Sequence, residues 1–189
     1  MKVRESGMPD EKIWNDFFDI DLILDEMKIN SEIESLVEIG CGYGTFTIPS
    51  ANRISTKLYG FDIEAGMLEI VQQKLRNENI KNVFLEQRDI LTQTTGLNES
   101  SIDYVMLFNI LHHDSPVDFL DEAYRILKTG GKIGIIHWRS DISTPRGPDL
   151  SIRPTPEQLL QTINRSKYEI YKEPFILKPY HYGLIISKI

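Results

Sequence analysis

The sequence feature that most constrains this fold is a largely apolar run that breaks into glycines, within residues 36–46. Residues 36–39 include β-branched side chains and predict a short buried strand. Glycines then stand at alternate positions from Gly40 to Gly44, and a helical pattern resumes after Phe46. Glycine tolerates backbone angles that a Cβ forbids, and it lets a ligand lie against bare backbone. The stretch therefore predicts a strand, a ligand-binding turn and a helix start.

Length and composition favour one globular domain over residues 1–189. A chain of 189 residues with 41% apolar and 26% charged residues is ordinary for a globular protein. The longest apolar runs fall far short of the roughly 20 residues that a membrane-spanning helix needs. The first residues lead into polar sequence, without the apolar core of a signal peptide. We therefore expect a cytoplasmic protein that does not associate with membranes.

Net charge and cysteine content indicate which partners and which cellular compartment to expect. The formal charge of -7 disfavours nucleic acid, because phosphate binding relies on clustered Lys and Arg. The single cysteine, Cys41, excludes an intramolecular disulfide and fits a reducing compartment. Cys41 lies inside the glycine turn, where a small spacer is the expected role and a reactive thiol is the alternative. The sequence predicts no metal ion and leaves the oligomeric state open.

Residues 1–30 are expected to form an N-terminal helical segment. One helix is predicted from Asp10 to about Phe18, and Asp19 is placed to cap a second that runs to Met27. Trp14 and its aromatic neighbours stand at helical spacing in the first of these helices. Two interpretations remain: ordinary packing against the domain, or a lid over the ligands.

Strands and helices alternate through the rest of the chain. After the glycine turn we expect strands at 57–62, 82–87, 101–108 and 132–138, and helices at 45–54, at 65–77 and from Ser115 to the Gly130-Gly131 pair. Ser115 and Pro116 supply a capping hydroxyl and a first-turn proline. A capping box at residues 155–158 starts a further helix, and residues 168–177 and 181–187 predict a hairpin.

This order predicts an α/β fold with a doubly wound, Rossmann-like sheet of seven strands. Five strands are parallel, and the C-terminal hairpin contributes at least one antiparallel strand. Ligands of such sheets bind beyond the carboxyl ends of the strands. The residues expected to face one crevice there are Gly40, Asp62, Asp89, Asn109 and Trp138. Asp62 ends the second strand about 20 residues after Gly40, the spacing at which an acid binds ribose hydroxyls.

Together these motifs resemble those of class I S-adenosylmethionine-dependent methyltransferases. The resemblance extends from Ser35 to the end of the chain. The segments that carry it are residues 37–44, Gly60-Phe61-Asp62-Ile63, Asp89-Ile90, residues 101–105 leading to Asn109, and residues 127–132. A nicotinamide dinucleotide is the rival cofactor, but its G-x-G-x-x-G fingerprint requires glycine where this chain has Thr45.

The resemblance implies S-adenosylmethionine as cofactor. Gly40, Cys41 and Gly42 would lie under its methionine portion, Glu38 would hold the turn or the amino group through water, and Asp62 would accept from the ribose hydroxyls.

Four further roles follow from the same resemblance. Ile63 and Met67 would flank the adenine, Asp89 would accept from its amino group, and the Ile90 amide would meet the ring. The Asn109 backbone would face the methionine amino group.

The methyl acceptor is less strongly constrained than the cofactor. Methyl transfer is an in-line displacement, and an acceptor that must lose a proton calls for a base such as histidine. His112, His113 and His137 follow the fourth and fifth strands and are the catalytic candidates, with structural hydrogen bonding as the alternative role. Trp14, Trp138, Arg139 and Arg146 are the candidates for binding the substrate, and the alternative for the arginines is a solvated loop.

A small-molecule acceptor is favoured by elimination. Within the resembling superfamily, enzymes that methylate nucleic-acid amino groups are expected to carry an Asn/Asp-Pro-Pro-aromatic motif, and residues 109–112 do not match it. A Pro-Cys nucleophile and the paired glutamates of protein arginine methyltransferases are also missing. The alternative function is a non-catalytic S-adenosylmethionine-binding sensor or partner subunit.

Overall fold

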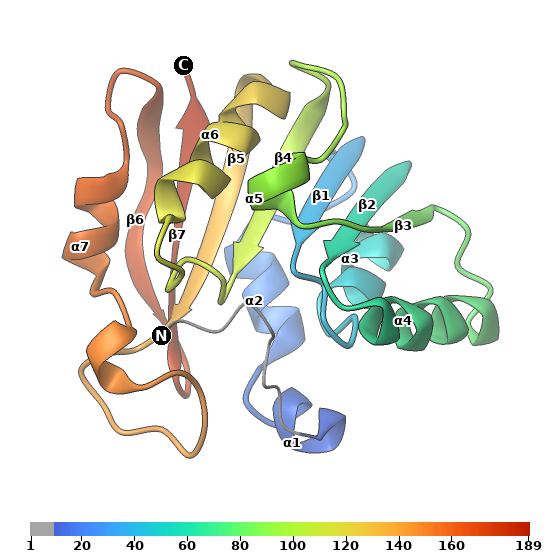
Figure 1. Cartoon of the computed structure of the whole chain (residues 1–189), viewed down its shortest axis with the longest axis horizontal. Helices are drawn as coiled ribbons and strands as arrows, with labels where there is room; N and C mark the ends of the chain where they lie inside the picture. Colours follow the sequence, from blue (N-terminus) through green and yellow to red (C-terminus); the bar gives the residue numbers. More distant parts are fainter. Residues whose placement is uncertain (1–9) are drawn as a thin grey trace.

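The computed structural model describes residues 10–189, which form one seven-stranded sheet flanked by helices (Figure 1). The strand order is β3-β2-β1-β4-β5-β7-β6. The strands are β1 (Ser35–Ile39), β2 (Lys57–Asp62), β3 (Val83–Gln87), β4 (Ile102–Phe108), β5 (Leu127–Trp138), β6 (Tyr168–Leu177) and β7 (His181–Lys188). Strands β1 to β5 are parallel, and β7 runs antiparallel to both of its neighbours. The predicted fold class is confirmed.

Helices cover both faces of the sheet. They are α1 (Glu11–Asn15), α2 (Ile20–Glu26), α3 (Thr47–Arg53), α4 (Ala65–Asn77), α5 (Ile90–Gln93), α6 (Pro116–Ile126) and α7 (Pro156–Thr162), with a 3-10 turn at Leu150–Ile152. In Figure 1, α5, α6 and α7 lie in front of the sheet and α2 and α3 behind it. Alternate residues of β4 serve the two faces: Val105 packs with the α6 cluster, and Met106 packs with the α2 and α3 cluster. This period of two is what a strand buried on both faces requires.

The predicted boundary between α6 and β5 is wrong. Helix α6 ends at Ile126, and the chain enters β5 at Leu127, five residues earlier than expected. Leu127 already pairs with Ile102, and residues 128–131 form an irregularity before Lys132 pairs with Tyr104. Gly130, at φ +77°, serves this bulge and does not end the helix. The Ser115 hydroxyl makes no capping hydrogen bond, and α5 was not expected from the sequence.

Of the two N-terminal helices, α2 forms as predicted, whereas α1 ends at Asn15, about three residues earlier than expected, and Phe18 instead forms an isolated bridge with Pro179. Asp10 accepts from the Lys12 amide, and Asp19 accepts from the Leu22 amide, so both acids cap their helices. The first nine residues of the expected 1–30 segment lie outside the described part of the chain. None of the helices within residues 10–189 combines the length and the apolar character that a membrane span requires.

Candidate active site

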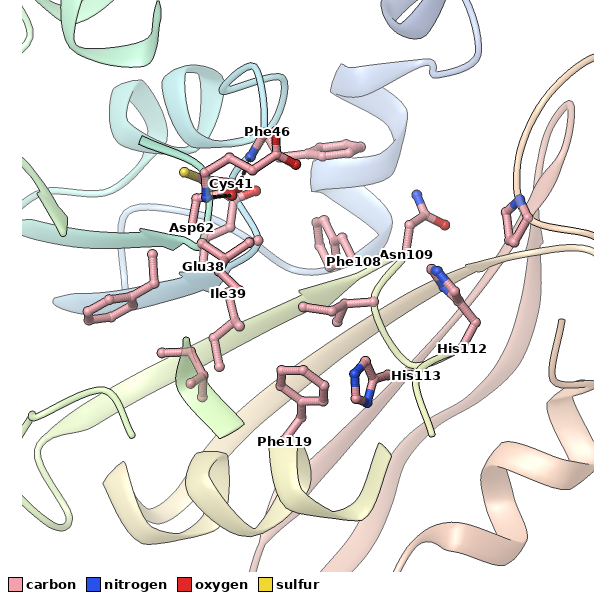
Figure 2. A pocket seen from close by; sticks show the side chains of 18 of the residues that line it. Glu38, Ile39, Cys41, Phe46, Asp62, Phe108, Asn109, His112, His113 and Phe119 are labelled. Carbon is pink, nitrogen blue, oxygen red and sulfur yellow. Dashed lines mark hydrogen bonds between the residues drawn. The ribbon is translucent and has the colours of Figure 1, made fainter. Parts of the chain in front are cut away.

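A cavity of about 540 Å³ opens beyond the carboxyl ends of β1, β2, β4 and β5. Figure 2 shows Glu38, Cys41 and Asp62 across it from Asn109, His112 and His113, and the other lining residues divide into the same two groups. We call the group from the end of β1, the glycine turn and the end of β2 the turn side: Glu38, Gly40, Cys41, Gly42 and Asp62. We call the opposite group the loop side: Asn109, His112, His113, Trp138 and Arg146. The sheet brings these segments together because parallel strands end at the same edge.

The glycine turn is held open by backbone geometry. Gly40 has φ +79° and Gly44 has φ +77°, in the region that favours glycine. A Cβ on Gly40 would lie 3.2 Å from Ile110 Cδ1, tighter than ordinary van der Waals contact. The amides of Gly40 and Cys41 both donate to the Phe61 carbonyl oxygen of β2. The turn therefore presents bare backbone to the cavity.

Two buried carboxyl groups support the turn. Asp62 accepts from the Gly42 amide at 2.8 Å and from the Glu64 amide at 2.9 Å, one bond to each oxygen. Each oxygen keeps a second lone pair for a ligand hydroxyl. Burial raises the pKa of Asp62, and it raises the pKa of Glu38 to about 8, although the hydrogen bond from the Thr47 hydroxyl opposes this. Burial likewise raises the pKa of Cys41, which favours the role of a small spacer over that of a reactive thiol.

Helix α1 is tied to the turn by polar contacts. The Thr45 hydroxyl donates to Asn15 Oδ1 at 2.8 Å, and Lys74 of α4 bonds both the Tyr43 carbonyl oxygen and Glu11. These contacts place Trp14 at the cavity, with its ring 6.1 Å from that of Trp138. Helix α1, for which the sequence allowed either ordinary packing or a lid, thus reaches the cavity through Trp14.

A buried arginine organises the loop of residues 139–153. The Arg153 guanidinium donates to the carbonyl oxygens of Pro148 at 2.8 Å and Arg139 at 2.9 Å, and to the Thr144 hydroxyl at 2.7 Å. It also lies 5.5 Å from the Trp138 ring centroid. Arg153 therefore holds the loop and does not face a ligand. Arg146 lines the cavity, and no described residue forms an ion pair with it.

Asn109 is the least satisfied residue of the site. It follows β4 with φ +57°, and its own amide donates to the Ile136 carbonyl oxygen at 2.8 Å. Its side-chain Nδ2 and Oδ1 are both enclosed, and neither has a hydrogen-bond partner within residues 10–189. Leaving a buried amide unpaired costs about 1–3 kcal/mol. Such a cost is expected where a ligand supplies the missing partners.

The three candidate histidines have different surroundings. His113 Nδ1 accepts from the Ser115 amide at 3.2 Å, and the Asp118 amide donates to the Ser115 carbonyl oxygen rather than to its hydroxyl. His137 is fully buried, and its Nδ1 lies 3.2 Å from the Trp138 carbonyl oxygen. His112 lines the cavity, and its ring meets the His137 ring edge-on at 5.4 Å.

Most of the predicted site residues meet at this one cavity. Those that line it are Trp14, Glu38, Gly40, Cys41, Gly42, Asp62, Ile63, Asp89, Ile90, Asn109, His112, His113, Trp138 and Arg146. Met67, His137 and Arg139 do not line it. Met67 lies in the first turn of α4, His137 is buried behind His112, and Arg139 pairs with Asp141 at 2.7 Å.

The sequence reading missed the aromatic and apolar walls of the cavity. They include Phe46, Phe108, Phe119, Pro148 and Ile152. The sequence held one signal for them. Phe46 comes just after the glycine turn, and Phe108 comes just before Asn109, so both had to lie near the ends of strands. The position of residues 148–152 depends on the fold of a long loop, for which the sequence holds no periodic signal.

Two curated relatives are methyltransferases by name. The chain is 29% identical over 120 residues to a demethylmenaquinone methyltransferase of Lactobacillus johnsonii, covering 61% of this chain and 47% of the relative. It is 29% identical over 103 residues to the aklanonic acid methyltransferase DauC of Streptomyces sp. strain C5, covering 53% and 46%. The chain spans less than half the length of these relatives.

A solved structure shares the whole fold. The crystal structure of an S-adenosylmethionine-dependent methyltransferase from Aquifex aeolicus superposes with a TM-score of 0.82 at 17% identity, covering 95% of this chain and 94% of the other. A family profile described as "Methyltransferase domain" matches residues 36–131, which run from β1 into β5 and hold the glycine turn, Asp62 and Asn109. The resemblance noted in the sequence is therefore confirmed, and the chain belongs to this methyltransferase family.

Proposed function

We propose that this protein transfers the methyl group of S-adenosylmethionine to a small-molecule acceptor by in-line displacement. The observation that carries the proposal is the convergence of the glycine turn and Asp62 on the same cavity as the unpaired amide of Asn109. One side then holds a nucleoside, and the other leaves room for a second molecule. The names of the two curated relatives support a small acceptor.

The turn side suits the cofactor that the family uses. The open backbone from Gly40 to Gly42, with Cys41 between, would lie along its methionine portion. Asp62 would accept from the ribose hydroxyls with its remaining lone pairs. S-adenosylmethionine supplies an electrophilic methyl group on a sulfonium.

The adenine would lie beyond Asp62, where three further predicted residues line the cavity. Ile63 would flank the ring, Asp89 would accept from its amino group, and the Ile90 amide would approach it. Met67 lies outside the cavity lining and is not part of the proposed adenine site.

The acceptor would bind on the loop side, against the aromatic rings of Trp14 and Trp138. Arg146 stands at this side and could meet an anionic group of the acceptor. Trp14 belongs to α1, so we propose that this helix acts as a lid that excludes water during transfer. Arg139 is left out of the substrate site because its guanidinium pairs with Asp141.

We also propose that the protein acts in the cytoplasm and without a nucleic-acid partner. The supporting features are the single, buried Cys41 and the formal charge of -7.

Calorimetry with S-adenosylhomocysteine tests the cofactor assignment. Wild type should bind, and Asp62→Ala should lose at least about 100-fold in affinity, because hydrogen bonds to a charged group contribute about 1.5–3 kcal/mol each. Asp62→Asn keeps one acceptor oxygen and should fall between the two. Absence of binding by wild type, or equal binding by the alanine variant, would overturn the assignment.

A second measurement separates the enzyme from a non-catalytic sensor. The protein is incubated with methyl-labelled S-adenosylmethionine and a small-molecule cell extract, and the transfer of label is followed. Label in an extract compound supports the enzyme. Binding of S-adenosylhomocysteine without any transfer would support the sensor.

A further inference from the structure

Hydrogen bonding on the loop side distinguishes the three candidate histidines. The Ser115 amide can only donate, so His113 Nδ1 must be the accepting nitrogen and the proton of the neutral ring sits on Nε2. To take up another proton, His113 would have to give up this bond at the start of α6. His137 is fully buried and does not line the cavity. His112 lines the cavity, and its ring meets the buried His137 ring edge-on at 5.4 Å.

The second observation is the unpaired Asn109 amide on the same side of the cavity. Figure 2 shows Asn109, His112 and His113 together, across from Glu38 and Asp62. Asn109 Nδ2 is an enclosed donor without a partner within the described chain. An oxygen atom that gains negative charge as it reacts is a suitable acceptor for it.

The third observation is the composition of the walls. Trp14, Phe46, Phe108, Phe119 and Trp138 line the cavity, and the Phe46 and Phe108 rings meet edge-on at 5.0 Å. Such walls favour a planar, apolar acceptor.

We propose that His112 accepts the proton of a phenolic or enolic hydroxyl group on a planar, apolar acceptor, while Asn109 Nδ2 donates to the reacting oxygen. A lone pair of this oxygen forms the bond to the methyl carbon, the sulfur–methyl bond breaks, and its electron pair stays on sulfur. The hydroxyl proton passes to an imidazole nitrogen of His112, so the ring gains the positive charge that the sulfonium loses. The inference rests on the proposed methyl transfer.

Proton affinities select this class of acceptor. Imidazole titrates near neutrality, and a phenol has a pKa of about 10, so the transfer is only moderately uphill and proceeds as the new bond forms. An aliphatic hydroxyl is far less acidic and would need a stronger base. A carboxylic acid is already ionised at neutral pH and would need no base.

A nuclear magnetic resonance measurement tests the assignment without turnover. Protein labelled with ¹⁵N-histidine should show the Nε2–H tautomer for the neutral form of the His113 ring, and the signals of His112 should move when S-adenosylhomocysteine and a simple phenol are added together. The variant His112→Gln assigns the signals. A His113 ring protonated on Nδ1 in its neutral form, or His112 signals indifferent to the phenol, would overturn the proposal.

Kinetics provide the second test. Transfer of label to the extract should fall about 10²- to 10⁴-fold in His112→Gln, the usual range for loss of a general base. Affinity for S-adenosylhomocysteine should stay within about twofold, because the turn side is intact. The wild-type rate should decline at acid pH as His112 becomes protonated. The titratable and charged groups near it are His137, whose ring meets it edge-on, its chain neighbours His113 and Asp114, and Arg146 and Asp149 of the same cavity lining.

A matched variant separates catalysis from structure. His113→Asn keeps an acceptor oxygen for the Ser115 amide, and it should keep the acidic limb of the pH profile, which His112→Gln should lose. The labelled product should be an aryl or enol ether. Label in a carboxylic ester, an amine or a carbon-bound methyl group would overturn the inference. Failure of wild type to bind S-adenosylhomocysteine would instead refute the proposed function itself.

Discussion

On the turn side of the cavity, polar groups find partners inside the protein: Gly42 bonds Asp62, and Thr47 bonds Glu38. On the loop side, both side-chain atoms of Asn109 lack a partner within residues 10–189. The turn side is made by residues close in sequence to β1 and β2, whereas the loop side draws on the segment after β4, the end of β5 and residues 139–153. The turn side, whose polar groups are hydrogen-bonded within the protein, suits the cofactor. The loop side, where the Asn109 side chain has no partner among the described residues, suits the methyl acceptor.

The largest expected effect concerns the buried acid of the turn side. Burial raises the pKa of Glu38 to about 8, so folding favours its protonated form. The stabilisation is fully present below the unfolded-state pKa, about 4.3, and is lost as pH rises through about 8. Denaturant unfolding should show stability falling by a few kcal/mol over this range, and Glu38→Gln should flatten the slope. Thr47→Val removes the hydroxyl that stabilises the ionised form of Glu38, so it should make stability fall more steeply with pH. If neither substitution changes the pH dependence of stability, the prediction is wrong.

The next effect is on cofactor affinity. Gly40→Ala places a Cβ 3.2 Å from Ile110 Cδ1 at φ +79°. Both the glycine turn and the Ile110 side chain must then shift. Affinity for S-adenosylhomocysteine, measured by calorimetry, should therefore fall about 100-fold. Gly66→Ala is the control, since a Cβ there meets nothing within 4 Å. Equal affinities of the two variants would contradict the role of the turn.

A smaller effect is expected from the loop side. Arg153→Met removes the guanidinium that bonds the carbonyl oxygens of Arg139 and Pro148. Unfolding should become easier by about 2 kcal/mol, since hydrogen bonds of charged groups contribute about 1.5–3 kcal/mol and part is recovered by burying methionine. Affinity for S-adenosylhomocysteine should change less than twofold. Arg139→Met removes only the exposed ion pair with Asp141 and should destabilise the protein less than Arg153→Met does, because exposed ion pairs contribute little.

The smallest effect has the opposite sign. Asn109→Gly removes an unpaired buried amide and a strained φ of +57°, so the protein should gain about 1 kcal/mol of stability while methyl transfer falls. Asn79→Gly is matched, because Asn79 has φ +55° but an exposed side chain. It isolates the backbone contribution. If Asn109→Gly destabilises the protein more than Asn79→Gly does, the amide has a partner that stabilises the fold.

The sequence predicted correctly the strands, helices and caps that depend only on residues close together in the chain. The strand of residues 57–62 and the helix of residues 65–77 have the predicted bounds, because alternation and helical spacing are properties of a few neighbouring residues. The capping box of Thr155 and Gln158 also forms as predicted. The start of β5 was missed because pairing of Leu127 with Ile102, far away in sequence, overrides the helical pattern. The contact between His113 Nδ1 and the Ser115 amide was not predicted, because no local sequence pattern signals it.

The sequence alone determined the glycine turn, the acid at the end of β2, the order of strands and helices, and hence the family. These depend on the short-range stereochemistry of glycine and on hydrophobic periodicity. Only the tertiary structure decided that Arg153 turns inward to hold its loop while Arg146 faces the cavity. Only the tertiary structure left the Asn109 amide unpaired beside His112. Hydrogen-bond satisfaction depends on every atom within about 3 Å, and distant segments of the chain supply those atoms.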